Sequence, residues 1–330
     1  MKCRISASTE IWPVAGSFII ARGAKTEVAI MVAQIEGEGV TGRGEATPIY
    51  YHGETAEICA MQVRAYQGRL CHDAIHEGMT RGAARNALDA ALWDWDAKKS
   101  GIPVWQAAGL PVPGAVATAI TVSLGTPEAM MRDAARAAAQ GFGLIKLKLA
   151  GEGDMDRVAV VRAGAPYARL IVDANEAWTG LDVAAMAAGL LPYGVELIEQ
   201  PVKAGEEHLL DGVRSPIPLC ADESCQDRSD LARCTGRYDA INIKLDKAGG
   251  LTEAMVLATE ARAAGMKVML GCMLSTSLGI APALLLAGQA DWVDLDGPLL
   301  LARDREGGVK ISDGQLIPPD RGFWGQKSQR

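Results

Sequence analysis

The sequence predicts an α/β protein, in which a barrel of parallel strands follows a smaller α+β domain. Two observations carry this prediction. Beyond residue 112, apolar runs of strand length alternate with alanine-rich segments of helical composition. Several of these apolar runs end in a charged residue, as expected when parallel strands deliver their carboxyl ends to one rim. A chain of 330 residues is long enough for both parts.

Composition limits the function classes. Hydrophobic residues make up 49% and charged residues 22%, which favours a large core over disorder. The net charge of −7 argues against nucleic acid as a partner. The start of the chain lacks a signal peptide and no apolar run has membrane-spanning length, so we expect a cytoplasmic protein without a membrane partner. Seven cysteines without a repeated spacing indicate reduced thiols.

The first part of the chain reads as a hairpin followed by helices. Apolar segments at 18–20 and 28–35 are separated by Ala21-Arg22-Gly23-Ala24, which predicts an antiparallel hairpin. Residues 37–42 match a dinucleotide-binding pattern, but no helix follows, so we interpret them as a β-turn. Residues 54–99 have helical spacing. Within them His72 and His76 lack the glutamate of a zinc-protease motif and are interpreted as surface histidines.

The breaker cluster Pro111-Val112-Pro113-Gly114 predicts the boundary before the barrel. We therefore expect a capping domain at 1–112, a barrel at 113–300 and a segment at 301–330 that packs back on the first domain. The eight strands are predicted near 118–122, 143–148, 169–173, 195–199, 217–221, 239–244, 267–271 and 291–295. The clearest helices between them are predicted at Pro127–Gln140 and Leu251–Ala264.

The strand at 144–149 alternates apolar residues with Lys146 and Lys148, so the two lysines share one face. By itself this pattern also fits a half-exposed strand with two solvated lysines. Four later apolar runs likewise end in charge, at Asp173, Glu199, Asp222 and Lys244. If the strands form a parallel barrel, all of these side chains converge on one rim.

Three converging carboxylates repel one another unless a cation lies between them. Each of Asp173, Glu199 and Asp222 alone could be an ordinary loop carboxylate or a helix N-cap. Together they form a set of hard oxygen ligands that suits Mg²⁺, which also leaves positions for substrate oxygens.

These residues occur in ordered motifs. The motifs are Lys146-Leu147-Lys148, Val172-Asp173-Ala174-Asn175, Ile198-Glu199-Gln200-Pro201, Ala221-Asp222-Glu223-Ser224 and Asn242-Ile243-Lys244. As an ordered set they resemble the enolase superfamily, within its muconate-lactonizing branch. The resemblance covers nearly the whole chain and implies a modified TIM barrel, (β/α)7β, with an α+β capping domain. It also implies Mg²⁺ on the three carboxylates, Lys148 and Lys244 as acid and base, and Lys146 as the ammonium that lowers the pKa of Lys148.

Further stretches resemble the L-Ala-D/L-Glu dipeptide epimerases within that branch. They are Ile20-Ala21-Arg22-Gly23, Lys244-Leu245-Asp246-Lys247-Ala248-Gly249-Gly250, Gly271-Cys272-Met273-Leu274 and Asp294-Leu295-Asp296-Gly297-Pro298. The resemblance implies that Asp294 and Asp296 hold the α-ammonium of a dipeptide and that Arg22 pairs with its glutamate side chain. It implies further substrate contacts from Thr121, Cys272 and Leu274, and the loop at 49–52 is where specificity could differ.

We therefore expect a two-base epimerase that converts L-Ala-D-Glu to L-Ala-L-Glu through an enediolate in cell-wall peptide recycling. The enzymatic alternatives are a dipeptide epimerase of other specificity, o-succinylbenzoate synthase, N-acylamino acid racemase and muconate cycloisomerase. The last three act on substrates without a free ammonium, which Asp294 and Asp296 disfavour. A catalytically silent metal-binding or peptide-binding protein is the alternative from another class. A homo-oligomer is compatible with the sequence, which does not determine the oligomeric state.

Overall fold

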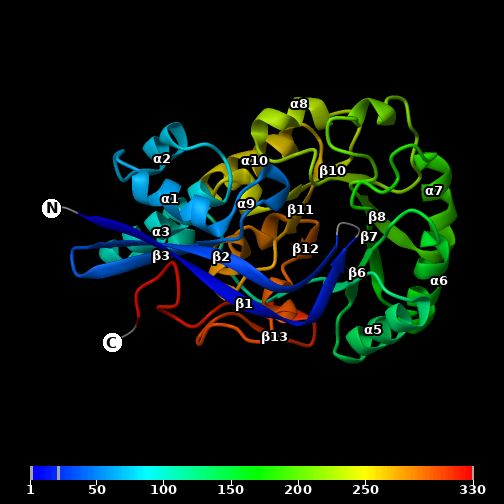
Figure 1. Ribbon diagram of the computed structural model, residues 1–330, viewed down its shortest axis with the longest axis horizontal. Helices are drawn as coiled ribbons and strands as arrows, with labels where there is room; N and C mark the ends of the chain where they lie inside the picture. Colours follow the sequence, from blue (N-terminus) through cyan, green and yellow to red (C-terminus); the bar gives the residue numbers. More distant parts are fainter. Residues whose placement is uncertain (1–2, 21–22, 329–330) are drawn as a thin grey trace.

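The computed structural model describes residues 3–20 and 23–328. An N-terminal capping domain lies at one end of the molecule and a barrel of parallel strands occupies the other (Figure 1). The fold class predicted from the sequence is therefore confirmed. Among the described residues, no helix combines the length and the apolar character that a membrane span requires.

The capping domain is an antiparallel sheet covered by helices. Its strands are β1 (Arg4–Ile20), β2 (Gly23–Gly37) and β3 (Val40–Ala46), and its helices are α1 (Ala56–Ala65), α2 (His72–Gly78) and α3 (Ala83–Ser100). The predicted hairpin and the turn after residue 37 are both confirmed, since Gly37 pairs with Val40 across that turn. A Cβ atom at Gly42 or Gly44 would collide with backbone atoms of α3, so these glycines allow the helix to pack closely on β3.

The barrel contains eight parallel strands in sequence order. They are β5 (Ile120–Val122), β6 (Leu144–Lys148), β7 (Arg169–Asp173), β8 (Val195–Glu199), β9 (Leu219–Ala221), β10 (Ala240–Ile243), β11 (Lys267–Gly271) and β12 (Trp292–Asp294). Each predicted strand has its counterpart. The two edges meet just before β5, where the amide of Ala119 donates to the carbonyl of Val293 at 2.7 Å. This hydrogen bond brings β12 beside β5 and nearly closes the barrel.

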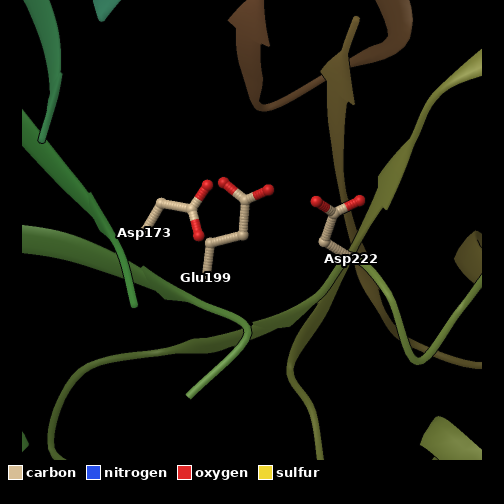
Figure 2. A group of neighbouring side chains, drawn as sticks. All are labelled: Asp173, Glu199 and Asp222. Carbon is tan, nitrogen blue, oxygen red and sulfur yellow. The ribbon is translucent and has the colours of Figure 1, made fainter. Parts of the chain in front are cut away.

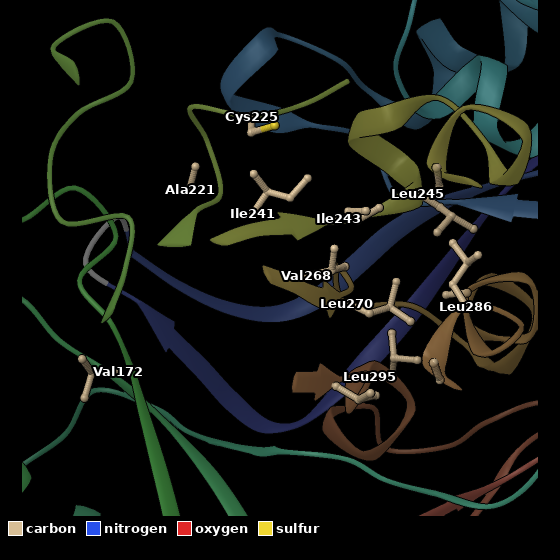
Figure 3. Packing of buried hydrophobic residues seen from close by; sticks show 14 of the residues in the cluster. Val172, Ala221, Cys225, Ile241, Ile243, Leu245, Val268, Leu270, Leu286 and Leu295 are labelled. Carbon is tan, nitrogen blue, oxygen red and sulfur yellow. The ribbon is translucent and has the colours of Figure 1, made fainter. Parts of the chain in front are cut away.

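Helices cover the outside of the barrel. They are α5 (Pro127–Ala139), α6 (Asp154–Gly164), α7 (Val183–Leu190), α8 (Leu231–Cys234), α9 (Leu245–Ala248), α10 (Leu251–Ala263) and α11 (Ser277–Leu284). The helices predicted at 127–140 and 251–264 are confirmed. Between β8 and β9 the only described helical segment is the short 3₁₀ helix η3 (Glu207–Leu210), so the outer layer is thin there. Leu270 and Leu286 belong to the apolar layer between strands and helices, which Figure 3 shows.

Period-two alternation divides the barrel interior into two layers. A buried apolar layer takes one residue from each strand or the residue just before it: Ala119, Leu144, Ile171, Leu197, Cys220, Ala240, Met269 and Trp292. Two residues further along each strand, the same inward face is mostly polar or charged. The apolar layer therefore closes the bottom of the barrel, and the charged layer lies at the carboxyl ends of the strands.

The capping domain is joined to the barrel by buried polar contacts. The His72 Nδ1 atom lies 2.6 Å from Oδ1 of the fully buried Asp89, and the Thr252 hydroxyl of α10 donates to the same oxygen at 2.7 Å. His76 Nε2 lies 3.9 Å from Asp89. The prediction that His72 and His76 are surface histidines is therefore wrong: both face a buried carboxylate at the contact between the two parts.

The C-terminal segment contacts the capping domain. Strands β13 (Lys310–Ser312) and β14 (Gln315–Ile317) form a small sheet with β4 (Val116–Ala117), just before the barrel. The short helix α4 (Val104–Ala107) also contacts the C-terminal segment, since the amide of Val104 donates to the carbonyl of Gly325 at 2.8 Å. The Trp324 indole nitrogen donates to the carbonyl of Arg43 on β3 at 3.0 Å. These contacts agree with a segment that packs back, while the exact boundaries at 112 and 300 stay predictions.

Candidate active site

The charged residues at the strand ends have fixed positions around the rim. In the order of the barrel, Lys146 and Lys148 lie on β6, Asp173 on β7, Glu199 on β8, Asp222 after β9, Lys244 after β10 and Asp294 on β12. Strands β6 and β10 are four positions apart in a barrel of eight, and so are β8 and β12. Lys148 and Lys244 therefore lie on opposite sides of the rim. The three carboxylates occupy the arc between them, facing Asp294 across the barrel.

Asp173, Glu199 and Asp222 form a buried carboxylate triad (Figure 2). One ligand atom from each lies within 4.8 Å of the others, and the residues are 0%, 1% and 2% exposed. Burial, followed by the nearby Asp173 carboxylate, raises the pKa of Glu199 to about 7. Burial also disfavours ionised Asp173, but Lys148 and Lys146 outweigh it and hold the pKa of Asp173 at about 2. Three carboxylates that are buried and this close together fit a divalent cation.

Lys146 lies at the centre of this charge network. Its ammonium is 2.7 Å from Glu199, 2.9 Å from Asp294 and 3.2 Å from Asp173, and the residue is 2% exposed. Burial by itself lowers the pKa of Lys146, but these carboxylates hold it well above its usual range. Lys146 is therefore an ammonium. The alternative of two solvated lysines on β6 is wrong, since Lys148 is also buried, with its ammonium 2.6 Å from Asp173.

Lys244 mirrors Lys148 on the other side of the triad. Its ammonium donates to Asp222 Oδ2 at 2.7 Å. Burial lowers the pKa of Lys244, but Asp222 and Glu199 outweigh burial and raise it well above its usual range. In this arrangement each of the two opposed lysines is paired with an outer carboxylate of the triad, one on Asp173 and one on Asp222.

Sequence reasoning did not identify Lys247. This residue is 1% exposed and donates to Asp222 Oδ1 at 2.6 Å and to the carbonyls of Cys225 at 2.9 Å and Asn242 at 3.1 Å. Lys244 and Lys247 together hold the pKa of Asp222 well below its usual range, although burial opposes them. Lys247 is not among the residues that line the pocket over the rim, and its contacts hold the loop after β9. Lys247 lies in one of the stretches that resemble the dipeptide epimerases, but no role was assigned to it from the sequence.

Two further carboxylates complete the rim at the end of β12. The amide of Thr121 donates to Asp296 Oδ2 at 2.7 Å, and Asp294 Oδ2 accepts from Lys146. Burial, followed by the adjacent Asp294 carboxylate, raises the pKa of Asp296 to about 7. Within the described residues, the buried Asp294 Oδ1 atom has no hydrogen-bond partner. This corner can therefore accept hydrogen bonds from a cationic ligand.

A pocket of about 730 Å³, part of it open to solvent, lies over the rim between barrel and cap. Nine of the residues predicted for the site line it: Thr121, Lys146, Lys148, Asp222, Lys244, Cys272, Leu274, Asp294 and Asp296. Asp173 and Glu199 lie deeper, among the fully buried residues. Arg22 lies outside the described residues.

The cap contributes residues that sequence reasoning did not assign. Thr47 lines the pocket, and its hydroxyl donates to the carbonyl of Leu274 at 2.6 Å. Tyr50 and Tyr51 come from the loop where specificity was expected to vary. Lys25 of β2 also lines the pocket, with its ammonium 4.4 Å from the centre of the Tyr50 ring. Burial lowers the pKa of Lys25, and none of its described neighbours is a carboxylate at ion-pair distance. No pattern in the sequence around Lys25 indicated that this residue of the hairpin would line the pocket over the rim.

Comparison with known proteins gives matches along the whole chain. Residues 3–109 match the family described as mandelate racemase / muconate lactonizing enzyme, N-terminal domain. Residues 129–323 match the family described as enolase C-terminal domain-like. These two matches cover the cap and the barrel separately.

Named relatives match with high coverage. The L-Ala-D/L-Glu epimerase of Escherichia coli (strain K12) is 43% identical over 312 residues, covering 93% of this chain and 97% of the relative. An N-acetyl-D-glutamate racemase of a Pseudoalteromonas species is 40% identical over 302 residues, covering 90% and 95%. Both relatives are isomerases that act on glutamate derivatives.

Solved structures agree with the fold. An enolase family member from Agrobacterium tumefaciens with homology to dipeptide epimerases, with bound sodium and L-Ala-L-Glu, superimposes with a TM-score of 0.92 at 42% identity, covering 98% of this chain and 100% of that one. A dipeptide epimerase from Enterococcus faecalis V583, complexed with Mg and L-Leu-L-Tyr, has a TM-score of 0.90 at 30% identity, covering 99% and 100%. The relatives thus bind both cations and dipeptides.

Proposed function

Because this chain belongs to the enolase superfamily, we propose that it is a Mg²⁺-dependent dipeptide epimerase that interconverts L-Ala-D-Glu and L-Ala-L-Glu. The observation that carries the proposal is the position of Lys148 and Lys244 on opposite sides of the rim, with three buried carboxylates on the arc between them. One catalytic group on each face of a carbon atom is the arrangement that inversion of that carbon requires.

Asp173, Glu199 and Asp222 would hold the Mg²⁺ ion. Their fit to a divalent cation rests on the donor set, since three buried carboxylates meet within 4.8 Å, and burial together with the Asp173 carboxylate raises the pKa of Glu199. When bound, Mg²⁺ supplies the positive charge that stabilises an enediolate formed next to a carboxylate. The ammonium of Lys146, 2.7 Å from Glu199, adds a fixed positive charge at the same place.

Lys148 and Lys244 would move the proton. One lysine removes the α-proton of the glutamyl residue from one face, and the other delivers a proton to the opposite face. Lys148 serves the D epimer and Lys244 the L epimer in the assignment that the family resemblance implies. Each lysine must be neutral when it acts as the base, so its pairing with Asp173 or Asp222 has to change when substrate and metal are present.

The two charged ends of the dipeptide would be bound on different sides of the pocket. Asp294 and Asp296 are suited to the alanyl α-ammonium, because they carry a free acceptor oxygen at the end of β12. Lys25 is suited to the glutamyl side-chain carboxylate, because it is a cation that lines the pocket without a carboxylate of its own among the described residues. Arg22, on the same hairpin, is proposed for the same carboxylate, and Thr121, Cys272 and Leu274 for the remaining contacts.

A second candidate function is racemisation of an N-acylated glutamate, which the 40% identity to the N-acetyl-D-glutamate racemase favours. An N-acyl group carries no ammonium, so Asp294 and Asp296 would have no cationic partner in that substrate. We therefore prefer the dipeptide. A catalytically silent binding protein is a weaker alternative, because binding alone does not require Lys148 and Lys244 to be buried at the rim.

The test is proton exchange in deuterated water with Mg²⁺. L-Ala-D-Glu, L-Ala-L-Glu and N-acetyl-D-glutamate are incubated separately with the protein, and mass spectrometry follows deuterium uptake while chiral chromatography follows inversion. We expect both dipeptides to gain one deuterium at the α-carbon and to interconvert, and a chelator to stop both processes. Absence of exchange in both dipeptides would overturn the proposal, and faster turnover of N-acetyl-D-glutamate would establish the second candidate.

The proposal has three further parts: a cytoplasmic location, a role in cell-wall peptide recycling and a homo-oligomeric state.

A further inference from the structure

Gln200 follows the proposed ligand Glu199 directly and is fully buried, with 0% of its surface exposed. Its φ angle is +38°, in the left-handed region that residues other than glycine rarely adopt. Such a conformation persists only where surrounding contacts enforce it. The backbone provides two of these contacts: the amide of Gln200 donates to the carbonyl of Cys220, and its carbonyl accepts from the amide of Glu176, both at 2.8 Å. Cys220 precedes the Asp222 loop, and Glu176 belongs to the loop after Asp173.

The side chain of Gln200 reaches the same ligand loop. Its Oε1 atom accepts from the backbone amides of Asp222 at 2.7 Å and Ser224 at 3.1 Å. Its Nε2 atom faces three acceptors, namely the carbonyl of Val202 at 2.7 Å, the hydroxyl of Ser224 at 2.8 Å and the hydroxyl of Tyr238 at 3.2 Å. Both polar atoms of the side chain therefore have partners, and the two bonds to Oε1 hold the backbone at Asp222 and at Ser224, two residues later.

We propose that Gln200 is the positioning residue of the carboxylate triad. Through its backbone and side chain, Gln200, which directly follows Glu199, connects the loop after Asp173 with the segment that carries Asp222. This inference rests on the proposed function, because it assigns Gln200 to the metal that the triad would hold. The physical need is clear: three carboxylates repel one another, and a loop held only by their attraction to a cation would spread when the cation leaves. Gln200 keeps the Asp222 loop in place without adding charge.

The test measures metal affinity directly, without turnover. Binding of Mn²⁺ to the full-length protein is followed by electron paramagnetic resonance of the free ion, in the wild type and in Gln200→Met and Gln200→Asn. Met keeps the length of the side chain but removes both polar atoms, and Asn keeps the amide but is too short to reach the loop in the same way. Since partners that orient metal ligands typically contribute 10- to 100-fold in affinity, we expect the Mn²⁺ dissociation constant to rise by about that factor in each variant. At saturating metal, the lost activity should largely return.

Tyr238→Phe is the matched control. It removes one hydroxyl from the same buried cluster but leaves the bonds from the amides of Asp222 and Ser224 to Gln200, so its Mn²⁺ affinity should stay within about threefold of the wild type. Wild-type affinity in a folded Gln200 variant would overturn the inference, and so would unfolding of both variants, which would make Gln200 a purely structural residue. If the wild type itself binds no divalent cation, the proposed function fails instead.

Discussion

Lys244 donates to Asp222 Oδ2 at 2.7 Å, so a proposed base and a proposed metal ligand share one ion pair across neighbouring strands. Lys148 and Asp173 repeat this relationship on the other side of the triad, at 2.6 Å. The two lysines therefore neutralise the outer carboxylates of the triad. In the proposed function, proton transfer by these lysines and cation binding by the triad would involve the same two carboxylates, which would couple the two processes.

Asp222→Asn should remove cation binding and activity together. The amide cannot replace the negative charge that Asp222 presents to a cation, so we expect kcat/KM to fall at least about a hundredfold. Mn²⁺ binding should be lost to the same degree. Asp227→Asn is the control, because Asp227 follows in the same loop but pairs with Arg81 at 2.9 Å, outside the pocket lining. Full activity of Asp222→Asn in excess chelator would contradict the assignment.

Single removal of each lysine should separate exchange from inversion. Lys244→Ala should still introduce deuterium into L-Ala-D-Glu through Lys148, and Lys148→Ala should do so only with L-Ala-L-Glu. Neither variant should invert the carbon, because the departing and arriving protons need different partners. Mass spectrometry combined with chiral chromatography measures both processes on the same sample. Near wild-type inversion in either variant, or equal exchange of both epimers in both variants, would refute the two-base assignment.

Lys25→Met should reduce the preference for an acidic second residue. A hydrogen bond to a charged group contributes about 1.5 to 3 kcal/mol, so kcat/KM for L-Ala-L-Glu should fall about 10- to 100-fold, with little change for L-Ala-L-Gln. Lys25→Arg should recover most of the loss. Lys99→Met is the control, since Lys99 is another cap lysine over an aromatic ring, at 4.6 Å from the centre of the Trp95 ring. An equal loss on both dipeptides would indicate a structural role.

Arg22→Met should likewise lower kcat/KM for L-Ala-L-Glu more than for L-Ala-L-Gln if both cations bind the side-chain carboxylate.

Asp246→Asn should change how stability depends on pH. Burial raises the pKa of Asp246 from 3.8 to about 7, although the amides of Thr47 and Asn86 donate to its Oδ1 atom. Between these values the unfolded chain has released the proton that the folded protein keeps, so this group makes the wild type less stable as pH rises. The variant cannot titrate there. We expect its stability relative to the wild type to increase by about 2 to 3 kcal/mol from pH 5 to pH 8.

Urea unfolding at several pH values measures this difference. A constant offset between Asp246→Asn and the wild type across the range would show that Asp246 is already ionised in the folded protein. The test is informative about the cap as well, because Asp246 of α9 holds Thr47, which lines the pocket from the other domain.

The sequence by itself determined the fold class and the positions of the rim residues. Alternation at 144–148 placed Lys146 and Lys148 on one face, and the charged ends of later apolar runs placed Asp173, Glu199 and Asp222 at one edge. These inferences need only the period of a strand and the parallel direction of its neighbours. The period is a local property, and the parallel direction follows from the alternation of strands and helices along the chain, so the predicted strands were recovered. The catalytic and binding roles remain predictions.

Only the tertiary structure decided which of these groups are paired and what else reaches them. His72 and Asp89 are 17 positions apart, Thr47 and Asp246 are 199 positions apart, and Gln200 meets Ser224 across 24 positions. No periodicity in the sequence indicates such contacts, because they depend on how the cap is packed against the barrel and how loops after different strands meet. The burial that raises the pKa of Glu199 and Asp246 has the same origin. A strand pattern specifies which way a side chain points, but its dielectric surroundings and its partners exist only when the distant segments have come together.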